Sequence, residues 1–359
     1  MNLLKGIILH GGHGTRLRPL THTGPKQLLP IANKPMSQYC LESLKDAEIT
    51  EIAIIVGGIG ANKVREYYGN GEQLGVKISY IEQDEPKGIA HAINLCQNFI
   101  GDEKFIVFLG DNIIQKSIKD FAQNFDKSNS DASILLCEVS DPSRFGIADV
   151  KNNKIIKIME KPKNPPTNLA VTGIYFLTPV IFKIFKILKP SWRNELEITD
   201  ALQLLLENKY KISYDVITDY WKDTGTPEDI IHANGVILEK MESYFYGIKE
   251  NEFKSKGKVM IGKNTKIEKD VEIQGPVIIG ENCIIKSKSK IGPNISIGNN
   301  TKISQVDIAK SIIMSDCIVE GDLKIRNSII SNNSQITVTE SNNKNEKIFL
   351  LGEGTKIIF

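Results

Sequence analysis

The sequence predicts an α/β domain that is followed by a coil of short parallel strands. Two observations lead to this fold class. Segments typical of strands and of helices alternate over the first part of the chain, and after about residue 255 the apolar residues recur every six positions. A chain of 359 residues is long enough for two domains. We place them at 1–250 and 251–359.

The first domain begins with strands and helices in regular alternation, which is typical of a mostly parallel sheet covered on both faces. We expect strands at 3–9, 52–56, 76–81 and 104–112, with helices over 36–47, around 64–68 and over 89–100 between them. Further strands at 132–139 and 173–177 and helices at 180–188 and 198–207 make the sheet mixed. A long helix from Pro227 to about Lys249 closes the domain.

The second domain carries isoleucine at every sixth position from Ile261 to Ile303, and a second series with the same period stands four residues further on, from Thr265 to Thr301. This period fits neither an α-helix nor a simple amphipathic strand. It resembles the repeat of hexapeptide left-handed β-helices, in which one aliphatic residue per face points inward. The final "KIFLLGEGTKIIF" is expected to pair with the end of the coil or with another subunit.

Composition excludes several classes of protein. A net charge of +2 gives no general attraction to nucleic acid, and no apolar stretch approaches the length of a membrane span. The start "MNLLKGIIL" is typical of a strand rather than of a signal peptide. The five cysteines have no metal-ligand spacing, so we expect buried, reduced thiols and a cytoplasmic protein.

The stretch "LHGGHGTRLRPLTHTGPKQLLP" follows the first strand and has the chemistry of a phosphate site. Glycines allow backbone N–H groups to approach anionic oxygens closely, Arg16 offers a planar fork, and Lys26 offers a point charge. The stretch matches neither the dinucleotide fingerprint nor the P-loop. A tight turn with two surface cations is the alternative interpretation.

This stretch resembles the signature of the sugar-1-phosphate nucleotidylyltransferases, and most of all the longer glucose-1-phosphate thymidylyltransferases that carry a β-helix tail. Further segments match in the expected order: "EQDEPKGIAHA", "LGDN", "RFGIADV", "MEKP", "VTGIYFL", "RNELEITD" and "WKDTGTPEDI". The resemblance covers residues 1–245, and the coil extends it. It implies a Rossmann-like nucleotidyltransferase domain that joins a nucleoside triphosphate to a sugar 1-phosphate and releases pyrophosphate.

The resemblance also implies a role for each matching residue. Arg16, Lys26 and Asp111 would be catalytic, and Asp111 and Asp223 would bind Mg²⁺. The nucleotide would bind to Leu9, Gly11, Gly12, Gly14, Thr15, Arg16, Lys26, Gln83, Gly88 and Asp111. The sugar phosphate would bind to Gly146, Glu160, Lys161, Val171, Tyr175 and Arg193. Taken singly, these residues also fit turns, a surface loop and a solvated charge pair.

Some questions stay open at this stage. The family usually has alanine where this chain has His10, and the histidine can lie near the base or pack beneath the loop. The resemblance implies that dTTP and glucose 1-phosphate give dTDP-glucose. The use of UTP, or of both nucleotides, is the alternative, and adenylyl or guanylyl transfer is disfavoured. An acyltransferase coil is also disfavoured because no histidine lies in it, and the retained Asp111 and Lys26 speak against an inactive regulator.

The flat sides of the coil favour a homo-oligomer.

Overall fold

The computed structural model describes residues 4–11, 14–248, 253–338 and 346–358. The chain forms two compact units. The first comprises Met1–His13 and Met36–Asp223, and the second comprises Gly14–Pro35 and Thr224–Phe359. The segment Gly14–Pro35 therefore belongs with the C-terminal coil, although it lies within the N-terminal domain in sequence.

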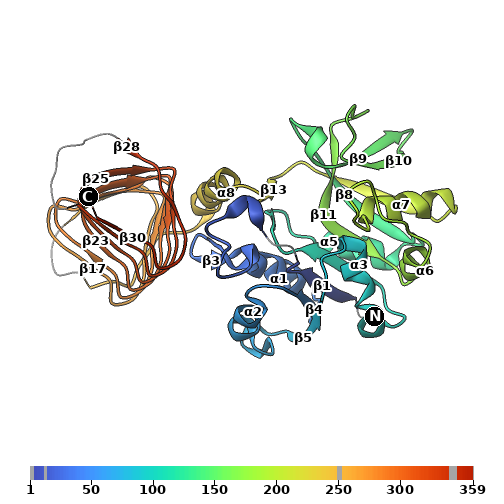
Figure 1. The fold of residues 1–359 in the computed structure, drawn as a ribbon, viewed down its shortest axis with the longest axis horizontal. Coiled ribbons are helices and arrows are strands. Elements are labelled where there is room, and N and C mark those ends of the chain that lie inside the picture. The colour runs from blue at the N-terminus through green and yellow to red at the C-terminus, as the bar shows by residue number, and fades with distance from the viewer. Residues whose placement is uncertain (1–3, 12–13, 249–252, 339–345, 359) are drawn as a thin grey trace. The chain divides into compact units, whose positions relative to one another are not determined.

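The first unit is built on a mixed sheet whose described strands run in the order β10-β9-β11-β6-β1-β4-β5, with β8 beside β11 and β12 beside β8. Figure 1 shows several of these strands, among them β1, β4, β5 and β11. The four strands β6, β1, β4 and β5 are parallel, as the alternating pattern predicted, whereas β11 is antiparallel to its neighbours. The bounds are β1 Lys5–Leu9, β4 Glu51–Val56, β5 Lys77–Glu82, β6 Phe105–Leu109, β8 Ala132–Glu138, β9 Gly146–Lys151, β10 Lys154–Glu160, β11 Leu169–Leu177 and β12 Ile212–Ile217. A separate pair joins β7 Asn112–Ile114 to β13 Trp221–Asp223.

Helices pack against the sheet of this unit. Helix α1 contacts β1, β6 and α5, while α3 contacts α6 and α7. The helices are α1 Met36–Asp46, α2 Ala61–Tyr68, α3 Ile89–Asn94, α4 Gln97–Ile100, α5 Lys119–Lys127, α6 Ile181–Phe185 and α7 Ile198–Glu207. The single helix expected over 89–100 is thus two short ones, and the helix expected over 180–188 is shorter.

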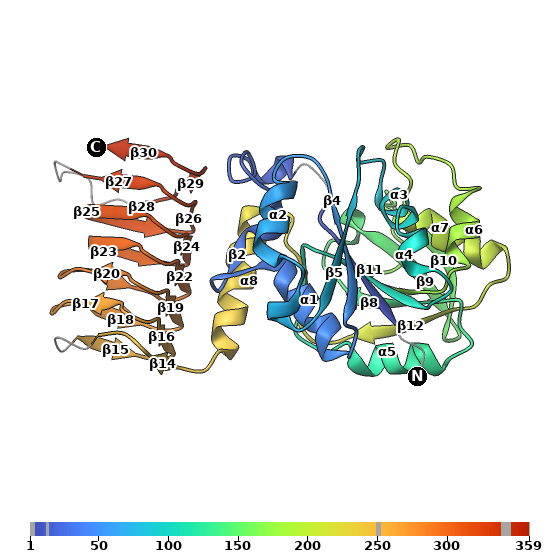
Figure 2. The ribbon, with the colours of Figure 1, turned by 90° about the horizontal axis from the view of Figure 1, so that it is seen from below.

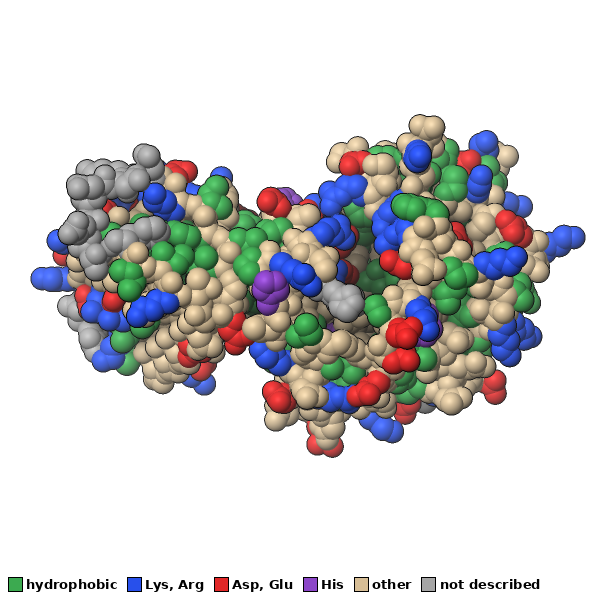
Figure 3. Space-filling view, viewed as in Figure 1, with side chains coloured by type: hydrophobic (Ala, Val, Ile, Leu, Met, Phe, Trp, Pro, Cys, Tyr) green, Lys and Arg blue, Asp and Glu red, His purple; other side chains and the backbone are tan. Residues whose placement is uncertain are grey.

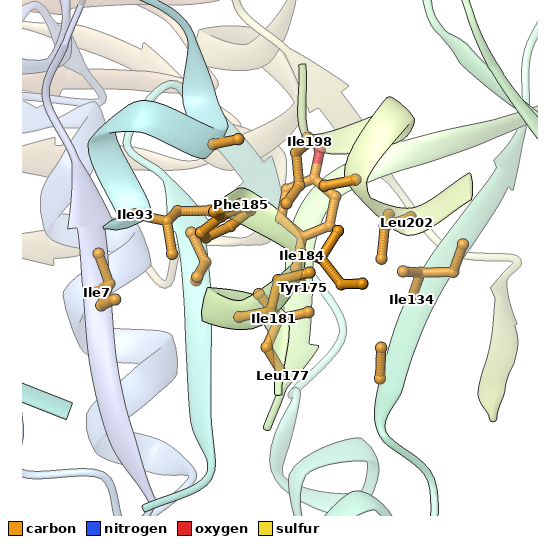
Figure 4. Packing of buried hydrophobic residues seen from close by; sticks show 14 of the residues in the cluster. Ile7, Ile93, Ile134, Tyr175, Leu177, Ile181, Ile184, Phe185, Ile198 and Leu202 are labelled. Carbon is orange, nitrogen blue, oxygen red and sulfur yellow. The ribbon is translucent and has the colours of Figure 1, made fainter. Parts of the chain in front are cut away.

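The core of the first unit lies between the sheet and the helices α3, α6 and α7. Ile7 and Leu9 of β1 alternate into it, as the period of two in a strand requires. Figure 4 shows Ile93, Phe185, Ile198 and Leu202 of these helices around Tyr175. Each position is buried, so the apolar periodicity of the sequence found the correct face of each element.

The second unit consists of the coil together with helix α8 and the hairpin of β2 and β3. One face of the coil stacks parallel strands in the order β14-β16-β19-β22-β24-β26-β29 (Figure 2). Their bounds are β14 Tyr244–Phe245, β16 Val259–Ile261, β19 Val277–Ile279, β22 Ile295–Ile297, β24 Ser311–Ile313, β26 Ile329–Ile330 and β29 Leu350–Leu351. The other strands are β15 Lys254–Lys256, β17 Lys266–Ile267, β18 Glu272–Gln274, β20 Ile284–Ile285, β21 Lys290–Ile291, β23 Lys302–Ala309, β25 Ile318–Arg326, β27 Gln335–Thr337, β28 Glu346–Lys347 and β30 Lys356–Ile358.

The register of the coil explains its six-residue period. Val259 pairs with Val277, and Val277 pairs with Ile295, so each turn spans three six-residue repeats. The isoleucine series and the second series that starts at Thr265 are both buried, and their apolar members share one core. Left-handed backbone recurs with the same period, at Asn264, Asp270, Asn282, Lys288, Asn294 and Asn300. Asparagine and aspartate tolerate this conformation best among residues with a side chain. The final segment pairs with the coil, because β29 joins β26 and β30 joins β27.

Charges alternate along one outer face of the coil, and we call this row the charge ladder. Directly paired positions in successive turns read Lys254, Glu272, Lys290, Asp307, Lys324 and Glu346. Nζ of Lys254 and of Lys290 lie 3.5 and 3.7 Å from the Glu272 carboxylate. Figure 3 shows basic and acidic side chains interspersed over the visible face of the molecule, in keeping with the near-zero net charge.

Helix α8, Pro227–Lys240, ends well before the expected Lys249. Met241 is extended, and the aromatic pair that follows enters β14 and pairs with β16. The helical prediction was wrong beyond residue 240 because pairing with the coil prevails over helical periodicity there. Thr226 caps the N-terminus of α8 by accepting the Asp229 N–H, and Pro227 occupies the first turn. Within the described parts of the chain, no helix combines the length and the apolar character that crossing a membrane requires.

Candidate active site

Asp111 and Asp223 lie side by side in the first unit, although 112 positions separate them in the sequence. The antiparallel pair of β7 and β13 sets Asp223 opposite Asn112, the residue after Asp111. Asp111 is 9% exposed and Asp223 is half-buried. The structure therefore brings the two predicted metal ligands to one place.

Asn112 fixes the orientation of Asp111. Its Nδ2 donates to Asp111 Oδ1 at 3.0 Å, and its Oδ1 accepts from Trp221 Nε1 at 2.8 Å. Gly173 passes so close that an added Cβ would lie 2.6 Å from Asn112 Nδ2. The sequence analysis did not assign a role to Asn112 or Trp221, and the signal available was their position within the segments "LGDN" and "WKDTGTPEDI".

The predicted sugar-binding residues gather around Glu160. Its Oε2 accepts from Thr199 Oγ1 at 2.9 Å, and its Oε1 lies 3.5 Å from Arg193 and 3.4 Å from Lys161. Gly146 pairs directly with Glu160, and a Cβ on this glycine would lie 2.5 Å from Thr199 Cγ2. These contacts bring together four of the six predicted sugar-binding residues.

Glu197 is a member of this cluster that the sequence analysis missed. Its side chain is 4% exposed, and its Oε1 accepts from Ser191 at 3.0 Å and from Arg193 at 3.3 Å. Burial raises the pKa of Glu197, and the nearby Glu160 carboxylate raises it further, whereas Arg193 opposes the shift. Glu197 thus helps to orient the guanidinium group of Arg193.

Tyr175 and Val171 occupy buried positions on β11. Tyr175 is 4% exposed and Val171 is 6% exposed. Burial raises the pKa of Tyr175, and the carboxylates of Glu160, Asp111, Glu197 and Asp223 raise it further. The tyrosine ring therefore lies within electrostatic reach of both the aspartate pair and the Glu160 cluster, which places these two groups of carboxylates in one region of the first unit.

Three predicted nucleotide-binding residues of the first unit, Leu9, Gly11 and Gln83, lie at the ends of β1 and β5. A Cβ on Gly11 would lie 2.8 Å from Gln83 Oε1, so these two predicted residues are neighbours. Gln83 Nε2 lies 3.1 Å from His91 Nδ1. The side chain of Leu9 packs in the core, and its carbonyl accepts from the Gly110 N–H. Gly12 lies outside the described residues.

Gly88 has a structural reason to be glycine. Its φ is +107°, and a Cβ would lie 2.5 Å from the carbonyl oxygen of Leu196. The N–H of Leu196 donates to Lys87 O, and Ala90 N–H donates to Leu196 O. This close approach ties the predicted base-binding loop to the segment that carries Arg193.

His10 is buried next to Tyr68, with its ring edge-on at 6.1 Å. Neither ring nitrogen has a hydrogen-bond partner among the described residues. Burial lowers the pKa of His10 to about 3, against a smaller opposite effect from Asp111. The imidazole is therefore neutral near pH 7.

The remaining predicted residues lie in the second unit. Gly14 adopts φ +56°, and its carbonyl accepts from Thr21 Oγ1 at 2.8 Å. Thr15 and Arg16 begin a short 3₁₀ turn, Thr15–Leu17, and their side chains are exposed. Lys26 begins another, Lys26–Leu28, and is half-buried. Both cations are thus held on short, ordered turns.

Residues 5–240 match the nucleotidyl transferase family, and residues 273–357 match the GMPPB C-terminal domain. The chain belongs to the nucleotidyl transferase family. It is 40% identical over 356 residues, 99% of both chains, to the glucose-1-phosphate thymidylyltransferase of Streptomyces antibioticus. It is 49% identical over 237 residues, 66% of both chains, to the low-salt glycan biosynthesis nucleotidyltransferase Agl11 of Haloferax volcanii. A solved UDP-glucose pyrophosphorylase with UDP-glucose matches 67% of this chain and all of its own, at 30% identity and a TM-score of 0.60.

Proposed function

We propose that this nucleotidyltransferase converts dTTP and glucose 1-phosphate into dTDP-glucose and pyrophosphate. The observation that carries the proposal is the pairing of Asp223 with the residue next to Asp111, in a chain similar along 99% of its length to a glucose-1-phosphate thymidylyltransferase. Transfer of a nucleotidyl group to a sugar 1-phosphate is the coarser activity that the family and its relatives support.

The reaction needs no general base. A phosphate oxygen of glucose 1-phosphate, already ionised near neutral pH, attacks the α-phosphorus of dTTP in line with the leaving pyrophosphate. One P–O bond forms, one breaks, and the electron pair leaves with pyrophosphate. Because two polyanions must meet, positioning and charge neutralisation supply most of the rate enhancement.

Asp111 and Asp223 suit a magnesium ion. Hard carboxylate oxygens are its preferred ligands, and Mg²⁺ commonly takes one or two carboxylates and completes its shell with water and substrate phosphates. No cluster of three or more His, Cys, Asp or Glu capable of holding a metal occurs among the described residues. When bound, the ion supplies charge neutralisation on the phosphates. Asn112 keeps Asp111 oriented for this task.

The phosphates are assigned to the glycine-rich stretch and its two cations. Backbone N–H groups of Gly11, Gly12, Gly14 and Thr15 bind the triphosphate, Arg16 holds the departing pyrophosphate, and Lys26 stabilises the charge that develops at the α-phosphate. Leu9, Gln83 and Gly88 are assigned to the binding of the base. Gln83 has both a donor and an acceptor, so it can pair with a pyrimidine edge.

The sugar phosphate is assigned to the cluster around Glu160. Glu160 accepts from sugar hydroxyls, while Lys161 and Arg193 meet the phosphate. Gly146 leaves room for Thr199 beside Glu160, and the buried Val171 and Tyr175 are assigned to the apolar side of the sugar. Supporting this assignment, Glu160 already stands among donors that hold its carboxylate in place.

The second candidate is uridylyl transfer, or the use of both pyrimidine nucleotides. It is favoured by the likeness to a UDP-glucose pyrophosphorylase at 30% identity. Thymine and uracil differ by one methyl group, whose contact with a pocket is worth only about 1–3 kcal/mol. We place dTTP first because the relative that matches nearly the whole chain is a thymidylyltransferase.

The test is a pyrophosphate-release assay that crosses dTTP, UTP, ATP and GTP with glucose, mannose, galactose and N-acetylglucosamine 1-phosphates. We expect the highest kcat/KM with dTTP and glucose 1-phosphate, and no turnover after Mg²⁺ is chelated. Preference for UTP would select the second candidate. Absence of turnover with every pair would refute both.

We also propose that the protein is a homo-oligomer in which the coil contributes contacts. The long parallel faces of the coil offer a flat surface for packing against another copy. Sedimentation velocity at micromolar concentration is expected to show a species larger than 40.0 kDa. A single species of monomer mass would contradict this.

A further inference from the structure

The hairpin that follows Lys26 is docked on the coil. Strands β2, Pro30–Ile31, and β3, Lys34–Pro35, pair antiparallel, and Ala32 and Asn33 form the turn with φ values of +49° and +61°. Two successive left-handed residues make a tight hairpin turn whose tip projects from the strands. Figure 2 shows β2 beside α8.

Asn234 of α8 joins the hairpin to the coil. It is completely buried, and its Oδ1 accepts from the Ala32 N–H at 2.8 Å and from the Ser296 hydroxyl at 2.6 Å. Ser296 lies on β22 of the coil. One side-chain oxygen therefore connects the hairpin tip, the helix and a strand of the coil.

Asn33 makes the second connection. Its Nδ2 donates to the carbonyl oxygen of Ile297 at 2.7 Å, and Ile297 is also on β22. A small apolar cluster closes around the same place, formed by Ala32, Leu238, Met260 and Ile278. The tip is thus fixed by two directed hydrogen bonds and by apolar packing.

Lys26 is connected to this tip by a short segment of chain. The turn Lys26–Leu28 is closed by the Leu29 N–H, which donates to Lys26 O at 2.9 Å. Leu29, which is 7% exposed, is the residue between that turn and β2. Because this segment is short and Leu29 is buried, we expect a displacement of the hairpin to displace Lys26 as well.

We infer that the coil is a positioning element for nucleotidyl transfer: Asn33 and Asn234 anchor the hairpin to the coil within the second unit and thereby fix the position of Lys26 in that unit. The inference rests on the proposed function for the role of Lys26. A displacement of about 1 Å in a catalytic group can cost on the order of 100-fold in rate, so an anchor remote from the chemistry has kinetic consequences. Asn33 and Asn234 are positioning residues and touch no reacting atom.

The test compares two glycine substitutions in the full chain. Asn33→Gly keeps a residue that adopts positive φ readily but removes the hydrogen bond to Ile297. The control is Asn264→Gly, because Asn264 has φ +58° and its Nδ2 donates to Asn282 within the coil at 3.1 Å. Asn234→Ala is a second variant. It removes the side-chain oxygen of α8 that accepts the hydrogen bonds from Ala32 and Ser296.

Two measurements are made on each variant. We expect Asn33→Gly and Asn234→Ala to lower kcat by about tenfold or more, with a smaller change in the KM for glucose 1-phosphate, and to speed hydrogen exchange in residues 26–35. Asn264→Gly should match the wild type in both. A merely structural effect would lower the amount of folded protein without changing kcat per folded molecule.

The outcomes separate the two claims. Unchanged exchange in residues 26–35 of both anchor variants, or faster exchange with wild-type kcat, would overturn the inference. A wild-type protein that turns over no nucleotide would refute the proposed function, while the exchange data would still report whether the coil anchors the hairpin.

Discussion

Asn112 is a neutral residue that orients the carboxylate of Asp111. It receives a hydrogen bond from Trp221 and passes one to Asp111, so the carboxylate is oriented before any ligand arrives. A side chain that is already oriented does not have to rearrange during the reaction, so no free energy is lost to reorganisation. The role that these contacts give Asn112 is to orient Asp111 through a short chain of hydrogen bonds.

At this scale we expect Asp111→Asn to reduce kcat by about 100-fold or more, because it removes a charge from the proposed magnesium site while keeping the shape of the side chain. Lys26→Ala should have a similar effect. Pyrophosphate release at varied Mg²⁺ measures both, with circular dichroism to check folding. The matched control is the exposed Asp102→Asn. Near-normal turnover in either site variant would mean that the residue roles are wrong.

His10 makes the stability of the protein depend on pH. Its pKa is lowered by burial to about 3 in the folded state, from 6.5 when exposed. Between these values the unfolded chain binds one proton more than the folded chain, so the free energy of unfolding decreases as the pH falls below 6.5. Above pH 6.5 this effect is absent.

We expect the free energy of unfolding, measured with denaturant, to be about 2 kcal/mol lower at pH 5 than at pH 7.5 because of His10. His10→Ala should reduce the difference between the two pH values, whatever its effect on absolute stability. His22→Ala, at an exposed position, should leave the difference unchanged. An equal pH dependence in the His10 variant and the wild type would show that the ring is accessible to protons in the folded state.

At the scale of elements, the regular patterns of the sequence predicted the structure well. The isoleucine series from Ile261 to Ile303 is buried throughout because each turn repeats the same inward position. The end of α8 could not be predicted from the sequence. Residues 241–249 keep an apolar content compatible with a helix, and what stops the helix is the strand partner that the coil offers to Tyr244 and Phe245.

The charge ladder makes a further prediction for the coil. Glu272→Lys would place three lysines in consecutive turns, so we expect the free energy of unfolding to fall by about 0.5–1 kcal/mol at low salt. The loss should shrink in 1 M NaCl, where exposed charges are screened. Asp102→Lys changes the net charge equally without touching the ladder, and it should cost less. Equal losses in both variants would mean that the pairing across turns contributes nothing.

At the scale of the whole molecule, the division of the chain into its two units could not be predicted from the sequence. Glycines and cations in "GTRLRPLTHTGPKQLLP" identify a candidate phosphate site, and the family resemblance extends this to each motif. Nothing in that stretch predicts that it packs with the coil more than 200 residues later, because the contacts of Ala32 and Asn33 are with a buried asparagine and a backbone carbonyl. Such partners carry no pattern in the sequence.

The alternation of charge along the coil also restricts how this domain can change in length. A single added or lost turn would bring two like charges together at the junction, whichever sign the new turn carried. Two turns at once would restore the order of signs. Insertions and deletions inside the coil are therefore expected to come as pairs of turns, because only an even number of turns preserves the order of signs there.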